Sequence, residues 1–156
     1  MTPWTQALQA AIVSGTLASA CSTLVLAWRG QRDTGATAAS LNAPSHWLWP
    51  SALRQDRPSL RYTLTGALVH HLASIFWACL YERMAPHGRA RGAGRALRDA
   101  AAVTVVAACV DLQLVPPRLT PGFERRLQRR SLTGVYLAFG AGLALAGLLA
   151  ARDRRG

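Results

Sequence analysis

The sequence contains no lysine and only 7 acidic residues, so all 18 basic residues are arginines and the formal net charge is +11. A charge of this size is typical of nucleic-acid-binding proteins, which carry arginines along one face beside aromatic residues that stack on bases. Here the arginines instead flank long apolar segments, as residues anchored among phospholipid head groups do. We therefore interpret the chain as a membrane protein with no nucleic-acid partner.

Motifs for covalent and phosphate chemistry are also missing. No serine lies in a Gly-x-Ser-x-Gly turn, and no glycine loop of the Walker type occurs. The three cysteines, Cys21, Cys79 and Cys109, lie inside apolar runs, which is typical of small buried residues and not of a disulfide framework. These absences favour a protein that is not an enzyme and that has no cofactor and no bound metal.

Four apolar segments are candidates for transmembrane helices, which need about 20 residues to cross a hydrocarbon core of about 30 Å. They cover about residues 4–28, 62–82, 99–115 and 131–151. The third is the shortest and contains Asp111. We predict an all-α integral membrane four-helix bundle that forms a single domain over residues 1–156, with an interfacial or re-entrant segment in the first connection.

The first and third connections have unusual compositions for simple turns. Residues 30–40 are small and polar and predict a flexible start to the first connection. The next residues combine tryptophans with a histidine and prolines, which predicts a segment that lies in the membrane interface or folds back onto the bundle. Two predicted helices separate the first connection from the third, so both connections lie on the same side of the membrane. The residues that we expect to form this interfacial or partner-binding surface are Asn42, His46, Trp47, Trp49, Thr120, Gly122, Phe123 and Glu124.

Small residues recur at four-residue spacing on two of the predicted helices. One set is Gly134, Ala138, Gly142 and Ala146, and the other is Ser14, Ala18 and Ser22. Faces of this kind let helix backbones approach closely in lipid. We expect them to pack within one chain, and a homodimer seam is the alternative.

The sidedness of the membrane protein follows from its arginines. Ten arginines lie on the side of the first and third connections and 8 on the other side. The second connection, residues 84–97, is short and dense in arginine and also contains His87. This density favours cytoplasmic termini.

Polar residues in the apolar segments fall at comparable depth, in the half nearest the first and third connections. They are His70, His71, Asp111, Tyr136 and Ser74. A polar group in hydrocarbon needs a partner, so we predict a polar intramembrane cluster that opens toward one side. Three interpretations remain: a structural clasp between helices, a small-molecule, ion or proton site, or an Asp111 that reaches head-group water.

A metal site is the weaker interpretation of the same histidines. Adjacent histidines point about 100° apart on a helix, so His70 and His71 cannot readily share an ion. A facial site would require His46 to fold inward beside one of these histidines and Asp111.

Several of these motifs resemble those of a group of small bacterial inner-membrane proteins that have no assigned activity. The segments that carry the resemblance are residues 42–49, 65–66, 70–71, 76–78, 81–82 and 119–124. The resemblance implies a multi-pass protein of the bacterial inner membrane and implies no reaction.

Three functions fit this pattern. The first is a non-enzymatic membrane subunit or helper whose partners are the lipid bilayer and either a second copy or another membrane protein. The second is a small oligomeric transporter or channel that uses His70, His71 and Asp111 as a proton or ion site. The third is a membrane enzyme that acts on a lipid or quinone.

Overall fold

The computed structural model describes residues 3–85 and 92–153, and every regular element among them is helical. The α-helices are α1 (Pro3–Thr34), α2 (Thr37–Asn42), α3 (Thr65–Arg83), α4 (Ala93–Cys109) and α5 (Arg129–Asp153). Short 3-10 turns cover Ala43–Trp47 (η1), Pro50–Arg54 (η2) and Phe123–Arg125 (η5). Two π-helical turns, Leu60–Leu64 (η3) and Val110–Leu114 (η4), extend α3 and α4. The predicted all-α class is confirmed.

Three helices of the described chain are long and apolar enough to cross a membrane. They cover Trp4–Thr34, Leu60–Arg83 and Arg129–Arg152, and they correspond to the first, second and fourth predicted segments. The third predicted segment is also helical, as α4 and η4, but it is not among the three. Its helix carries Arg98, Asp99 and Asp111, which are too many charges for its length.

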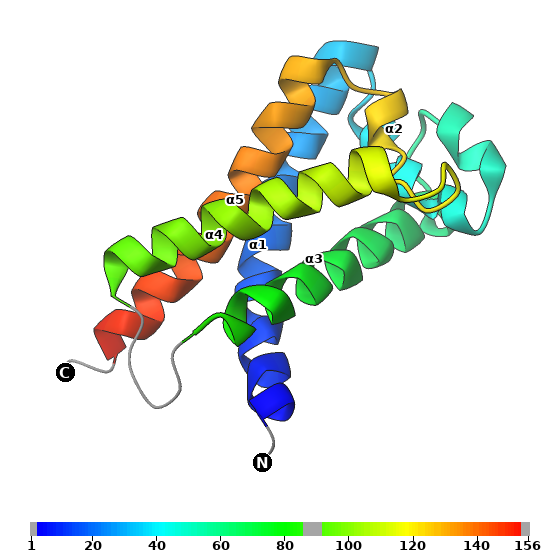
Figure 1. Ribbon diagram of the computed structural model, residues 1–156. Coiled ribbons are helices and arrows are strands. Elements are labelled where there is room, and N and C mark those ends of the chain that lie inside the picture. Colours follow the sequence, from blue (N-terminus) through cyan, green and yellow to red (C-terminus); the bar gives the residue numbers. More distant parts are fainter. Residues whose placement is uncertain (1–2, 86–91, 154–156) are drawn as a thin grey trace.

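The helix α1 is the centre of the arrangement (Figure 1). It packs along both α3 and α5, and α4 packs mainly on α5. Contacts between α3 and α4 are few. The start of α1, the end of α3, the start of α4 and the end of α5 lie toward one end of the molecule in Figure 1, and the first and third connections lie at the other.

Close approach of the helices explains the small residues that the sequence repeats. A Cβ atom on Gly142 would lie 2.5 Å from Cα of Ala18, so α5 and α1 are in backbone contact there. A Cβ atom on Gly15 would lie 2.7 Å from Cα of Ile75, so the same holds for α1 and α3. The small residues on α1 and α5 therefore serve packing within one chain.

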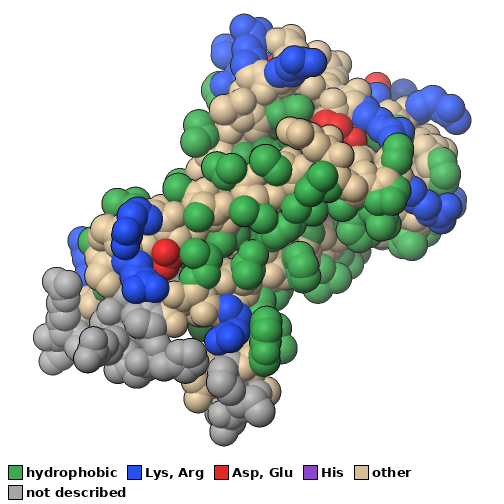
Figure 2. All heavy atoms as spheres, in the orientation of Figure 1, with side chains coloured by type: hydrophobic (Ala, Val, Ile, Leu, Met, Phe, Trp, Pro, Cys, Tyr) green, Lys and Arg blue, Asp and Glu red, His purple; other side chains and the backbone are tan. Residues whose placement is uncertain are grey.

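Small side chains fill the interior, and large ones face outward. Of the 23 buried hydrophobic residues among those described, 14 are alanines. Leucines and aromatic residues such as Leu24, Leu72 and Phe76 are more than 60% exposed. Figure 2 shows apolar side chains across the middle of the face over α3 and α4, with arginines toward the ends. A soluble monomer rarely exposes so much contiguous apolar surface, whereas small interior residues are typical of helices that associate in lipid.

The prediction of a flexible start to the first connection is wrong, because these residues are helical. The helix α1 continues to Thr34, and α2 follows after Gly35, which has a φ of 75°. The Ser40 hydroxyl donates a hydrogen bond to the backbone carbonyl of Leu26 at 2.7 Å, and this bond fixes α2 against α1. The predicted basic residues His87, Arg89 and Arg91 of the second connection, and Arg154 and Arg155, lie outside the described residues.

Substitution of Gly142 tests the contact between α1 and α5. We expect Gly142→Ala to lower the free energy of unfolding by about 1–3 kcal/mol, because the added methyl group forces two backbones apart. Gly134→Ala is the matched control on the same helix, since its Cβ atom would lie at an ordinary 3.8 Å from Val25. Unfolding in detergent, followed by circular dichroism, gives both values. Equal stability of the two variants would contradict the close packing.

Candidate functional site

A cavity of about 680 Å³ opens between α3 and α4. Its walls come from all four long helices and from the first and third connections. Side chains of α3 that line it include Val69, His70, Ala73, Ser74, Phe76 and Trp77, and those of α4, η4 and α5 include Ala107, Asp111, Tyr136 and Phe139. Ser22 of α1 lies on the same wall, and Pro44, Trp47, Leu119, Pro121 and Phe123 close the end nearest the connections. The volume falls in the range of ligand pockets.

Among the described residues, Asp111 is the only carboxylate on the cavity wall. It lies in the π-helical turn η4, where the backbone N–H of Val115 donates to the carbonyl of Val110 at 3.0 Å. Such turns often occur at functional sites. The Tyr136 hydroxyl donates a hydrogen bond to Oδ2 of Asp111 at 3.2 Å, and Trp77 lines the same cavity. This bond connects η4 to α5.

His70 bonds to α1 and not to Asp111. Its Nε2 lies 2.8 Å from the hydroxyl oxygen of Ser22. That hydroxyl oxygen also lies 2.8 Å from the backbone carbonyl oxygen of Ala18 and 3.2 Å from that of Ser19. Among the described residues, no hydrogen bond joins a histidine to Asp111. His70 acts as a clasp between α3 and α1, and Asp111 as a separate polar group in the same cavity.

The other predicted members of the polar cluster differ in position. Ser74 is buried and lines the cavity, and its hydroxyl donates to the backbone carbonyl of His70 at 2.8 Å. His71 is half-buried and does not line the cavity. Among the described residues, no group of three or more His, Cys, Asp or Glu is placed to hold a metal ion.

The first and third connections meet at the end of the cavity. The His46 side chain is buried, with Nδ1 2.9 Å from the carbonyl of Ala43 and Nε2 3.4 Å from the carbonyl of Pro117. The indole of Trp47 donates to the backbone carbonyl of Thr120 at 2.8 Å. His46 therefore holds one connection to the other and does not fold inward beside Asp111, as the facial metal site would require.

Gly122 allows this contact between the connections. Its φ is 85°, and a Cβ atom there would lie 2.6 Å from Nδ1 of His46 and 2.7 Å from the carbonyl oxygen of Ala43. Next to it, the ring of Phe123 packs edge-on to His70 and Tyr136, with centroid distances of 6.2 and 6.4 Å. The third connection thus contributes directly to the cavity wall.

Two other predicted surface residues have structural roles. The Asn42 side chain is fully buried and donates to the carbonyls of Gln55 and Arg57, at 2.9 and 3.1 Å, while its oxygen accepts from Thr63. Trp49 packs edge-on to Tyr62, with the guanidinium of Arg61 4.6 Å from its ring centroid. Glu124 pairs with Arg125 at 3.7 Å and lies close enough to Asp111 to repel it electrostatically.

Phe76, Trp77 and Phe139 line the cavity and form an aromatic wall that the sequence does not predict. Aromatic residues at helical spacing are more often packing residues than site residues. All three phenylalanines of the chain, two of its five tryptophans and one of its three tyrosines line this cavity. Only the packing of four helices brings them together.

No family model matches the chain, and neither do the curated proteins or the solved structures with which it was compared. The function must therefore be argued from the geometry of the cavity.

Substitution of Gly122 tests the junction of the two connections. Gly35→Ala is the matched control, because Gly35 also has a positive φ but has open space where its Cβ atom would lie. We expect Gly35→Ala to lower the free energy of unfolding by about 1 kcal/mol through backbone strain alone. Gly122→Ala should cost clearly more, because the methyl group also collides with His46 and Ala43. Denaturant titration of both variants measures the difference, and similar values would mean that the junction tolerates displacement.

Proposed function

We propose that the chain is an integral membrane protein of four transmembrane helices, whose cavity between α3 and α4 binds a lipophilic small molecule that enters from the bilayer. In this proposal the protein is a non-enzymatic binding subunit or helper. The observation that carries it is a cavity of about 680 Å³ whose lining is mostly apolar and includes a few polar groups such as Asp111, Tyr136 and Ser74.

The two ends of α1 support the membrane location. Trp4 and Trp28 are both more than half exposed, and 24 residues of helix separate them by about 36 Å. This distance is slightly longer than the hydrocarbon core of about 30 Å. The guanidinium of Arg83 lies 4.7 Å from the ring centroid of Trp4, and that of Arg29 lies 4.3 Å from the ring centroid of Trp28. Tryptophans stacked with arginines at both ends are suited to the two membrane interfaces.

The fourth crossing in this proposal is α4 with η4. The 17 residues of α4 continue into the five residues of η4, which together rise by about 33 Å. Both of its acids have partners, because Asp99 is paired with Arg95 at 3.6 Å and Asp111 accepts from Tyr136. Paired charges reduce the cost of placing such a helix in lipid.

Access to the cavity supports a ligand that arrives through lipid. Leu72, Phe76 and Leu119 line it and are 63%, 66% and 48% exposed. An apolar rim of this kind is in contact with acyl chains if α3 and α4 cross the bilayer. The resemblance of the sequence to bacterial inner-membrane proteins and the arginines of the second connection favour that membrane, with cytoplasmic termini.

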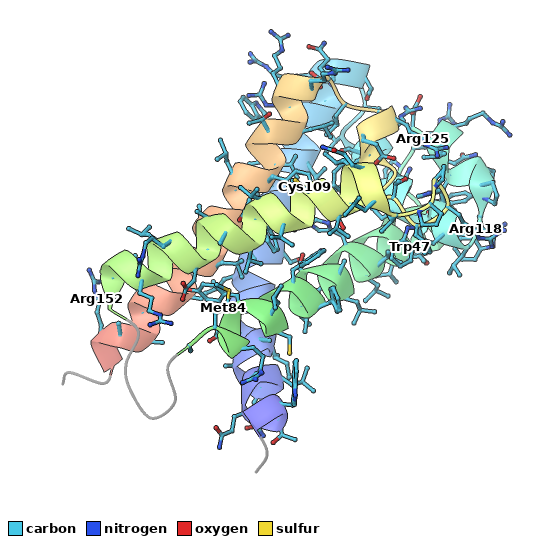
Figure 3. The ribbon with its side chains drawn as sticks, viewed as in Figure 1. Trp47, Met84, Cys109, Arg118, Arg125 and Arg152 are labelled. Atoms are coloured by element: carbon cyan, nitrogen blue, oxygen red, sulfur yellow. The ribbon has the colours of Figure 1, made fainter. Side chains whose placement is uncertain are left out.

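Cys109 tests whether α4 crosses the membrane. It is exposed on α4 (Figure 3), so in the bilayer it should face lipid. With Cys21 and Cys79 replaced by alanine, we expect a membrane-impermeant maleimide to leave Cys109 unmodified in opened membrane sheets, because thiolate formation requires water. The same reagent should modify Cys109 after solubilisation in SDS.

Arg118→Cys, in a background without Cys109, is the positive control for this labelling. Arg118 is exposed beyond the end of η4, in the third connection (Figure 3). Modification of Cys109 at the rate of this control would show that α4 lies outside the hydrocarbon.

Photolabelling tests the cavity itself. A neutral alkyl diazirine should label peptides of α3 and α4 in a saturable manner that excess unlabelled alkane prevents, because a cavity has a finite capacity and a lipid-facing surface does not. We expect Ala73→Trp to abolish the saturable part, since Ala73 lines the cavity and indole would fill it. Ala67→Trp is the matched control on α3, because Ala67 does not line the cavity. Labelling that does not saturate would contradict the proposed function.

A further inference from the structure

We propose that the ligand of this cavity is a lipophilic cation, which pairs with the carboxylate of Asp111 between aromatic walls. This inference rests on the proposed function, because it names the chemical class that the same cavity accepts.

The charges on the cavity wall have one sign. None of the arginines that the structure describes lines the cavity. Asp111 is the one carboxylate on the wall among the described residues. An anionic amphiphile would meet this carboxylate there and no described arginine. A cation beside Asp111 would leave no net charge in the low-dielectric interior, where an unpaired charge is costly.

The helix that carries Asp111 adds to this preference. Asp111 lies in η4, the last turn of the helix that starts at Ala93. Carbonyl groups at a helix C-terminus carry partial negative charge, which attracts cations and disfavours carboxylates. Helix stability therefore does not explain an acid at this position, whereas a bound cation would interact favourably with both the acid and the helix end.

A hydrogen bond holds the Asp111 carboxylate in place, and the carboxylate keeps acceptor sites that a ligand can use. Tyr136 donates one hydrogen bond to it, and an ionised carboxylate has about four acceptor sites. This donor holds the carboxylate on the cavity wall and leaves sites for a ligand. The nearest histidine on the wall, His70, is occupied by Ser22, so it does not compete for the carboxylate.

The aromatic walls suit a bulky cation better than a flexible acyl chain. The aromatic residues that line the same cavity as Asp111 are Phe76, Trp77, Phe123, Tyr136 and Phe139, together with Trp47. The faces of aromatic rings carry negative partial charge and attract cations within about 6 Å, most strongly where water is excluded. An uncharged alkane would gain only burial from the same rings.

The experiment compares two probes of nearly the same size that differ in charge. Methyltriphenylphosphonium is a cation, and triphenylphosphine oxide is neutral. Calorimetric titration of the purified full-length protein in a non-ionic detergent measures both affinities. We expect the cation to bind at least about tenfold more tightly and Asp111→Asn to remove this difference. Ala73→Trp should abolish binding of both probes, which excludes partition into the micelle.

The outcomes separate the two proposals. Equal affinities of wild-type protein for both probes, or tighter binding of the anion tetraphenylborate, would overturn the cation preference and leave a lipophilic-ligand cavity in place. Absence of any binding that Ala73→Trp can abolish, together with unsaturable photolabelling, would overturn the cavity function as well. The comparison of probes on wild-type protein needs no variant, so it decides even if Asp111→Asn fails to fold.

Discussion

The backbone contact of α1 with both α3 and α5 is the constraint on which the rest of the structure depends. Gly15 brings α3 onto α1, and Gly142 brings α5 onto Ala18 of the same helix. Both neighbours pack on the small faces of α1, and leucines on their other faces, such as Leu72 and Leu137, are more than 60% exposed. The helix α4 packs on α5 instead, where Gly140 makes room for Thr104. It therefore lies apart from α3, and the space between these two helices is the cavity.

Much of the fold could be predicted from the sequence, because helix boundaries and small-residue spacing are local properties of the chain. The spacing of Gly134, Ala138, Gly142 and Ala146 predicted a close helix contact, and Gly142 makes it. The position of α2 against α1 could not be predicted, because it depends on the bond from Ser40 back to Leu26. Whether the charged helix α4 crosses a membrane depends on how its charges are paired, and composition alone does not give such pairs.

The candidate site was only partly predictable for the same reason. Depth along each helix predicts a common level for His70 and Asp111, and both line one cavity. The rotation of each helix about its own axis decides which hydrogen-bond partners its side chains meet, and helix packing fixes that rotation. It directs His70 toward Ser22 and Asp111 toward Tyr136. The aromatic wall needed even more information, because its side chains come from several helices and from both connections.

The hydroxyl groups of α1 have a consequence for the order of assembly. Ser14, Thr16 and Ser22 each donate a hydrogen bond to a carbonyl four residues earlier in the same helix. The helix α1, which precedes α3, α4 and α5 in the chain, thus satisfies these polar side chains by itself. In the bilayer that we propose, it can be inserted alone and remain stable until α3, which begins at Thr65, emerges. The small faces of α1 then act as the template on which the later helices are added in turn.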